Sequence, residues 1–125
     1  MVSGRIGRAV CWGHVFERTS MSLTFEQFRK ANVNRNAQSF PGCNEWEGVD
    51  WGNALAGEVG EACNVVKKIK RDGYSVNRVD ALEKELADVV CYADLLASHY
   101  GIDLGEAVRS KFNEVSDRVN SPIKL

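Results

Sequence analysis

Apolar residues recur every three or four positions along two long stretches of the chain, which is the period of an α-helix with one buried face. In both stretches the steps alternate between four and three residues, so each forms a heptad seam of the kind that packs antiparallel helices. The seam positions are Leu55, Val59, Ala62, Val66 and Ile69, then Leu82, Leu86, Val89, Ala93, Leu96 and Tyr100. No segment alternates with period two for long enough to form a strand. The pattern predicts an all-α fold of the four-helix-bundle type with an antiparallel central helix pair.

Local capping signals predict where the helices begin and end. Thr24 and Gln27 form a capping box for a first helix that ends near Asn34. Residues 35–49 contain one proline and two glycines and are expected to form a loop. The three later helices are expected to begin at Asp50, Asp80 and Asp103, and to end near Arg71, near Tyr100 and before Pro122.

The third helix is apolar on faces other than its seam, at Ala87, Val90, Cys91, Leu95 and Ala97. A helix that is apolar on several sides is buried on several sides. Because a chain this short has few helices to cover it, we expect a homodimer or a dimer of dimers.

Composition and charge limit the classes of partner that the protein is expected to bind. The 125 residues include 16 basic and 17 acidic side chains, a net charge of −1, which gives no reason to expect nucleic acid or an anionic membrane surface as partner. No apolar run approaches the roughly 20 residues of a membrane span, so a soluble protein is expected. Residues 1–20 carry a charge of +2 and lack the apolar core of a signal peptide, so we interpret them as a peripheral extension of one domain at 21–125.

The four cysteines, Cys11, Cys43, Cys63 and Cys91, are widely separated, and no two form a C-x-x-C pair. With only two histidines in the chain, they match no zinc-finger spacing. We expect reduced thiols in a cytoplasmic protein.

Two pairs of acids stand out against the apolar seams: Glu58 with Glu61, and Glu85 with Asp88. Each pair is spaced i, i+3, so both side chains leave one helix face, and both pairs occupy the same flank of their seams. A hairpin centred on Gly73 would set the two pairs level. A centre at residue 75 would slide them by about 6 Å, from the rise of ~1.5 Å per residue. Either register brings four carboxylates together.

Crowded carboxylates repel or take up protons unless a cation compensates them, and oxygen-only ligands suit Mg²⁺, with Mn²⁺ as a substitute. Iron is disfavoured because neither pair is the Glu-x-x-His of di-iron bundles. The alternative is a set of solvated acids beside Lys67, Lys68 and Lys84. Gly60, between the first two acids, indicates close approach of another group, although helix packing would explain it equally well.

The acids and their surroundings resemble the MazG-like all-α nucleoside triphosphate pyrophosphohydrolases, which include dCTP pyrophosphatases and phosphoribosyl-ATP pyrophosphohydrolase. The signature of that superfamily is Glu-x-x-Glu followed, after a gap, by Glu-x-x-Asp. Here the gap comprises residues 62–84. The two segments that carry the resemblance most clearly are ALAGEVGEA and LEKELADVVCYADLL. The resemblance covers about residues 50–120.

The resemblance implies that Glu58, Glu61, Glu85 and Asp88 hold Mg²⁺ against the triphosphate. A metal-activated water would attack the α-phosphorus and release pyrophosphate and a nucleoside monophosphate. Glu61 is our choice of general base, with Glu58 as the alternative. The substrate contacts that we expect are Lys111, Asn113 and Arg118 in the fourth helix, Tyr92 after the second motif, Trp51 as a stacking face, and Lys68.

The match to dCTP pyrophosphatases is incomplete. The fourth helix lacks their Asn-Arg-Arg run and Tyr-Pro ending, and Lys67-Lys68 stands where they have an aromatic residue. The base and sugar therefore stay open, with a dNTP or modified NTP favoured over phosphoribosyl-ATP. A non-enzymatic helical dimer or regulatory module is the competing hypothesis, and it has no need of the four acids.

Overall fold

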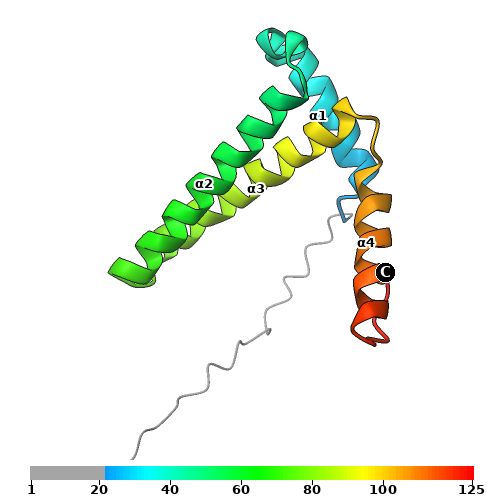
Figure 1. Ribbon diagram of the computed structural model, residues 1–125. Helices are drawn as coiled ribbons and strands as arrows, with labels where there is room; N and C mark the ends of the chain where they lie inside the picture. The colour runs from blue at the N-terminus through cyan, green and yellow to red at the C-terminus, as the bar shows by residue number, and fades with distance from the viewer. Residues whose placement is uncertain (1–21) are drawn as a thin grey trace, which may run out of the picture.

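The computed structural model describes residues 22–125, and every regular element in that range is a helix (Figure 1). The elements are α1 (Phe25–Ser39), the short 3₁₀ helix η1 (Pro41–Glu45), α2 (Gly48–Asp72), α3 (Val76–His99) and α4 (Leu104–Arg118). This confirms the all-α fold class for the described residues. The extension expected at residues 1–20 lies outside them. Cys43, Cys63 and Cys91 are free thiols, and Cys11 lies outside the described residues.

Two of the four predicted helix starts are confirmed and two are wrong. Thr24 caps α1 and Asp103 caps α4, each accepting a hydrogen bond from the backbone three residues on. The N-cap of α2 is Glu47, not Asp50, whose carboxylate instead accepts from the Glu47 backbone N–H at 2.9 Å in a capping box. Ser75 caps α3 five residues before Asp80.

The loop expected at 35–49 is largely helical. The first helix continues past Asn34 to Ser39, and η1 follows after Phe40. The loop was predicted from Pro41, Gly42 and Gly48, and all three lie beyond the end of α1 at Ser39. Asn32 donates to the Cys91 carbonyl of α3 at 3.0 Å, and Asn36 lines a cleft between α1 and α3. Tertiary contacts therefore override the weak local preference.

The helices α2 and α3 lie side by side and are joined by residues 73–75 (Figure 1). Gly73 ends α2 with a φ of 90°, a left-handed conformation that glycine adopts without a Cβ penalty. Arg78 donates to the Gly73 carbonyl at 3.0 Å and fixes the turn. The connection is centred on residue 74, between the two centres considered from the sequence.

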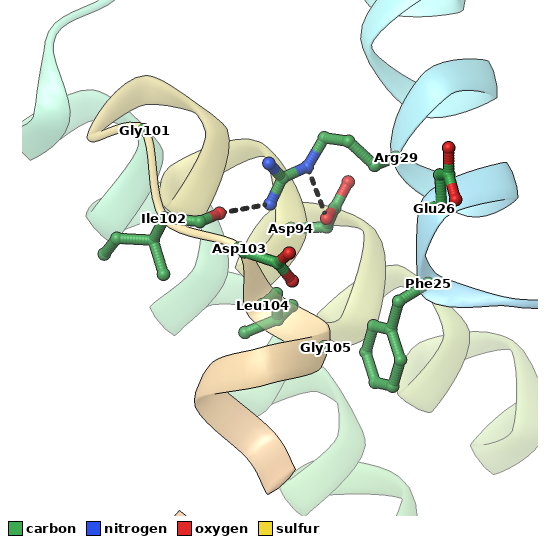
Figure 2. A pocket seen from close by; sticks show the side chains of 9 residues that line it. All are labelled: Phe25, Glu26, Arg29, Asp94, Gly101, Ile102, Asp103, Leu104 and Gly105. Atoms are coloured by element: carbon green, nitrogen blue, oxygen red, sulfur yellow. Dashed lines mark hydrogen bonds and ion pairs between the residues drawn. The ribbon is translucent and has the colours of Figure 1, made fainter. Parts of the chain in front are cut away.

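The N-terminal helix α1 is fastened to α3 by a buried polar network. Asp94 is 1% exposed and accepts hydrogen bonds from Arg29 Nε at 2.7 Å and from Asn32 Nδ2 at 3.1 Å. Arg29 also donates to the Ile102 carbonyl at 2.9 Å, in a pocket between α1 and the start of α4 (Figure 2). Because its carboxylate is paired, Asp94 can be buried among apolar residues.

The four helices do not close into a bundle within one chain, so the expected bundle is incorrect for the single chain. Helix α4 follows the Ile102 connection, contacts α1 and stands away from most of the α2–α3 hairpin (Figure 1). Several seam residues remain open as a result: Val59 is 43% exposed, Val66 51% and Leu86 52%. The apolar residues buried in the described chain are Trp51, Ala62 and Ala97.

Candidate functional site

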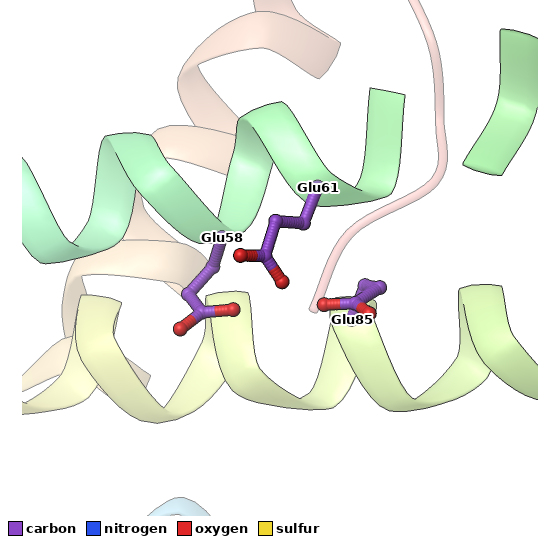
Figure 3. Close-up of side chains that lie close together, drawn as sticks. All are labelled: Glu58, Glu61 and Glu85. Carbon is purple, nitrogen blue, oxygen red and sulfur yellow. The ribbon is translucent and has the colours of Figure 1, made fainter. Parts of the chain in front are cut away.

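Three carboxylates meet between α2 and α3. Glu58 and Glu61 project from α2 and Glu85 from α3, and each offers one oxygen that lies within 4.8 Å of the other two (Figure 3). Glu58 and Glu85 are half-buried, and Glu61 is exposed. The fourth predicted member, Asp88, lies outside this closest group, but its negative charge acts on both Glu58 and Glu85.

Local helix geometry explains the grouping. One helical turn separates the two acids on each helix, so they share a face. The short turn at 73–75 then sets the two faces level, with Glu61 beside Glu85. Convergence of the acids, expected from the sequence register, is therefore observed for Glu58, Glu61 and Glu85.

The electrostatics of the cluster are those of uncompensated acids. Burial raises the pKa of Glu58 above its ordinary value of 4.5, and the negative charges of the other three acids raise it further. Burial also raises the pKa of Glu85, aided by the charge of Glu61, a hydrogen bond to it and the charge of Asp88. None of the ion pairs found in residues 22–125 includes any of these acids.

This donor set suits a hard divalent cation. Carboxylate oxygens from two helices can surround a Mg²⁺ or Mn²⁺ ion, whose charge would offset the repulsion that raises the pKa values. The lysines that could have neutralised the acids, Lys67, Lys68 and Lys84, form no ion pair with them within the described part of the chain. A metal centre explains the cluster better than a solvated helix flank.

Helix packing within this chain does not explain Gly60, and close approach of another group stays a prediction. A Cβ placed on Gly60 would meet no atom within 4 Å among its neighbours, so the position is open in this chain. At Gly48, by contrast, a Cβ would collide with the exposed ring of Tyr100. Close contact between helices therefore occurs where α2 begins and α3 ends.

An aromatic group adjoins the acids. Trp51 packs edge-on against Trp46, with ring centroids 4.7 Å apart, and lies 6.4 Å from the ring of Tyr92. Tyr92 lies one helical turn after Asp88 on α3, where burial raises its pKa and the charge of Glu58 raises it further. Trp51 is 5% exposed, so it supports Tyr92 from within the core and offers little free surface for stacking.

The comparisons with known proteins agree with this geometry. The MazG nucleotide pyrophosphohydrolase domain model matches residues 51–121, more than half of the chain and the segment that carries all four acids. The chain belongs to the MazG nucleotide pyrophosphohydrolase family. It is also similar to the Gene 37 protein of Mycobacterium phage L5, with 37% identity over 87 residues, which is 63% of this chain and 75% of the phage protein.

Family membership identifies the chain as a nucleotide pyrophosphohydrolase in general terms. Enzymes of the MazG family generally depend on a divalent metal, and the acidic cluster provides a place for one. Among the described helices, none combines the length and the apolar character that crossing a membrane requires.

The remaining substrate contacts expected in this MazG chain are not gathered at the acids. Lys111 pairs with Glu114, and the side chain of Asn113 hydrogen-bonds to the backbone of Leu125 at both its N–H and its carbonyl. Arg118 ends α4, which stands away from the hairpin (Figure 1). Lys68 is exposed on α2, seven residues after Glu61 and thus about 10 Å further along the same flank.

A second feature escaped the sequence analysis. A cavity of about 280 Å³ lies between α1 and α3, reaches the acids at Asp88, and is lined by Asn32, Arg35, Asn36, Phe40, Cys43, Asp88, Cys91, Tyr92 and Leu95. The available sequence signal was the pair Asn32 and Asn36, which are spaced i, i+4 and share one face of α1. Their relation to the acids depends on how α1 packs, which no local pattern contains.

Proposed function

We propose that the protein hydrolyses a nucleoside triphosphate, a dNTP or modified NTP, at the α-phosphorus to yield a nucleoside monophosphate and pyrophosphate. The observation that carries the proposal is the convergence of Glu58, Glu61 and Glu85 with no cationic side chain paired to them in the described chain. A triphosphate brings divalent cations with it, and this cluster supplies the oxygen ligands that such ions prefer.

Glu58, Glu61, Glu85 and Asp88 would hold Mg²⁺. When bound, the ion neutralises charge that develops on the phosphates and lowers the pKa of its water. Glu61, the exposed acid of the closest group, serves as the proton acceptor for the attacking water, with Glu58 as the alternative. Tyr92, one helical turn after Asp88 on α3, would contact the sugar or the base.

A second copy of the chain is part of the proposal. Val59 and Val66 lie seven residues apart on one side of α2, and Leu86 and Val90 lie four apart on one side of α3, all in positions away from the acids. These four side chains are 43–52% exposed. Such an apolar face is normally covered. We expect a homodimer or a dimer of dimers to cover it.

The phosphate contacts on α4 depend on the same assembly. Lys111, Asn113 and Arg118 carry the charge and hydrogen-bonding capacity that a triphosphate needs, but they lie on a helix that stands away from the hairpin of their own chain. Because α4 also leaves Val108 and Phe112 about 40% exposed, we expect packing between copies to bring its polar side to the carboxylates.

The test is hydrolysis of a nucleotide panel with Mg²⁺, read by phosphate release after added inorganic pyrophosphatase. A parallel reaction in H₂¹⁸O without that enzyme is read by mass spectrometry of the products. The panel contains the canonical dNTPs and NTPs, damaged nucleotides and phosphoribosyl-ATP. Attack at the α-phosphorus places ¹⁸O in the monophosphate, and attack at the β-phosphorus places it in pyrophosphate. Glu58→Gln should abolish turnover, and Glu83→Gln, an exposed acid outside the cluster, should leave it intact.

Three outcomes would contradict the proposal. Label in pyrophosphate alone would exclude attack at the α-phosphorus. No release from any nucleotide would favour the non-enzymatic helical module, and turnover of phosphoribosyl-ATP alone would reassign the substrate.

A further inference from the structure

The cavity between α1 and α3 reaches the acids at Asp88, and Glu58, Glu61 and Glu85 are not part of its lining. Asp88, the fourth acid, lines the cavity. Tyr92, whose pKa is raised by the charge of Glu58, lines it as well. A molecule whose phosphates lay at the acids would therefore extend its remaining part into this space. The volume of about 280 Å³ is close to the lower end for small-molecule pockets and suits one ring system rather than a whole nucleotide.

The two sides of the cavity differ in chemistry. Phe40, Tyr92, Leu95 and two thiols supply a largely apolar wall, which is suited to a flat ring. Helix α1 supplies the polar side through Asn32, Arg35 and Asn36. An apolar wall with a few polar groups is the usual composition of a ligand site.

Two polar groups of the lining have unused hydrogen-bonding capacity: Asn36, whose side chain forms none of the hydrogen bonds found in residues 22–125, and Arg35, which is exposed and carries more donors. Asn32 is committed, because its Nδ2 donates to the Cys91 carbonyl at 3.0 Å and to Asp94 at 3.1 Å. Arg35 makes a single long bond, from Nη2 to the Asn32 Oδ1 at 3.5 Å, and joins none of the ion pairs of residues 22–125. Its other N–H donors remain for whatever fills the cavity.

We propose that this cavity holds the base of the nucleotide and that Arg35 selects bases with two adjoining hydrogen-bond acceptors, namely cytosine or guanine. The inference rests on the proposed function. A guanidinium offers parallel donors and no acceptor. Cytosine presents N3 beside O2, and guanine presents N7 beside O6. Thymine and uracil carry an N–H between their carbonyls, and adenine carries an amino group beside each ring nitrogen of that edge.

The cavity is a poor place for the triphosphate itself. The ring of Phe40 and the side chain of Leu95 would desolvate phosphate oxygens without giving them hydrogen bonds. The phosphates belong at the acids with their metal ions, which leaves the cavity to the uncharged base. Arg35 therefore acts on specificity rather than on the hydrolytic step.

Two measurements on the full chain test this assignment. The first is kcat/KM for the four dNTPs with Mg²⁺, and the second is calorimetric binding of the four deoxynucleoside monophosphates in EDTA. The variants are Arg35→Gln, Arg35→Lys and the control Arg109→Gln, which removes an exposed arginine of α4. Arg35→Lys keeps the charge but loses the paired donors.

We expect the wild-type protein to prefer cytosine or guanine in both measurements. Arg35→Gln and Arg35→Lys should each lose about 5- to 150-fold with the preferred base, as expected for one paired contact, and should change little with adenine and thymine. Arg109→Gln should retain the wild-type preference.

The outcomes separate this inference from the proposed function. An equal loss for all four bases would make Arg35 a phosphate contact and overturn the inference, while hydrolysis itself would stand. Base-selective binding in EDTA that Arg35→Gln removes, without hydrolysis, would support the inference and overturn the function. Hydrolysis with no base preference would overturn the inference alone, and neither binding nor hydrolysis would overturn both.

Discussion

Glu61 and Glu85 meet across the α2–α3 hairpin, with a carboxylate oxygen of each within 4.8 Å of the other. Neither acid has a cationic partner among the described ion pairs, and after burial the charge of Glu61 is what most raises the pKa of Glu85. Without metal, the fold therefore holds together charges that repel each other. Stability should respond to anything that neutralises them.

The first prediction concerns pH. The pKa values of Glu58 and Glu85 are raised in the folded chain above the ordinary 4.5, so the folded state binds more protons than the unfolded state at and above that pH. The two acids therefore disfavour folding at neutral pH, and this penalty fades as the pH falls toward 4.5. Without metal, the Tm of the wild-type protein at pH 7 should therefore be lowered relative to that of Glu58→Gln. This difference in Tm should shrink as the pH falls toward 4.5.

Magnesium supplies the control for this effect. Saturating Mg²⁺ at pH 7 should raise the Tm of the wild-type protein by binding the folded state, and should raise that of Glu58→Gln less. Thermal melts at each pH, with and without the ion, measure both effects. A constant Tm difference between the two proteins from pH 5 to pH 7 would contradict the raised pKa values.

Lys111 should matter for turnover and little for folding. If its ammonium stabilises charge on the phosphates in the transition state, Lys111→Ala should lose about 2–4 kcal/mol, or roughly 30- to 900-fold in kcat/KM. Arg109→Ala is the matched control, because it removes another exposed i, i+3 ion pair of α4. Steady-state kinetics measure kcat/KM for both variants. Equal values would show that Lys111 does not contact the substrate.

The pair of Arg29 and Asp94 should control stability. Arg29→Ala leaves the carboxylate of Asp94 buried at 1% exposure with Asn32 as its remaining side-chain donor. Removing one partner of a buried pair costs about 3–5 kcal/mol. Urea unfolding at fixed protein concentration should show this loss, whereas Arg109→Ala should change stability by less than about 1 kcal/mol. Equal midpoints for the two variants would show that the network does not hold α1.

The open apolar face should be an interface between copies. Light scattering at micromolar concentration should give at least twice the 13.9 kDa of one chain. Val66→Lys should shift the protein toward the monomer, because a charge would be buried in the contact, and Lys67→Gln at the neighbouring exposed position should not. A wild-type monomer under these conditions would refute the assembly.

Much of the candidate site was determined by the sequence. Capping is local, so the hydrogen bonds of Thr24 and Asp103 could be predicted from residues three positions apart. The acids could be paired because helical spacing fixes the face of each residue and a glycine marks the turn. The same local rules failed at Asp50 and Asp80, because α2 begins from Glu47, which is not a preferred N-cap residue, and because Ser75 caps α3 earlier in the chain.

Tertiary structure alone decided what surrounds the acids. Asp94 is a lone charge in an apolar stretch, and its partner Arg29 lies 65 residues away, so local periodicity could not identify the pair. The cavity with Arg35 exists because that pair fastens α1 against α3, and α4 stands apart because the Ile102 connection redirects it. Helical periodicity specifies which side of a helix is apolar. Which element covers that side, and what faces the acids, depends on packing between segments distant in the sequence.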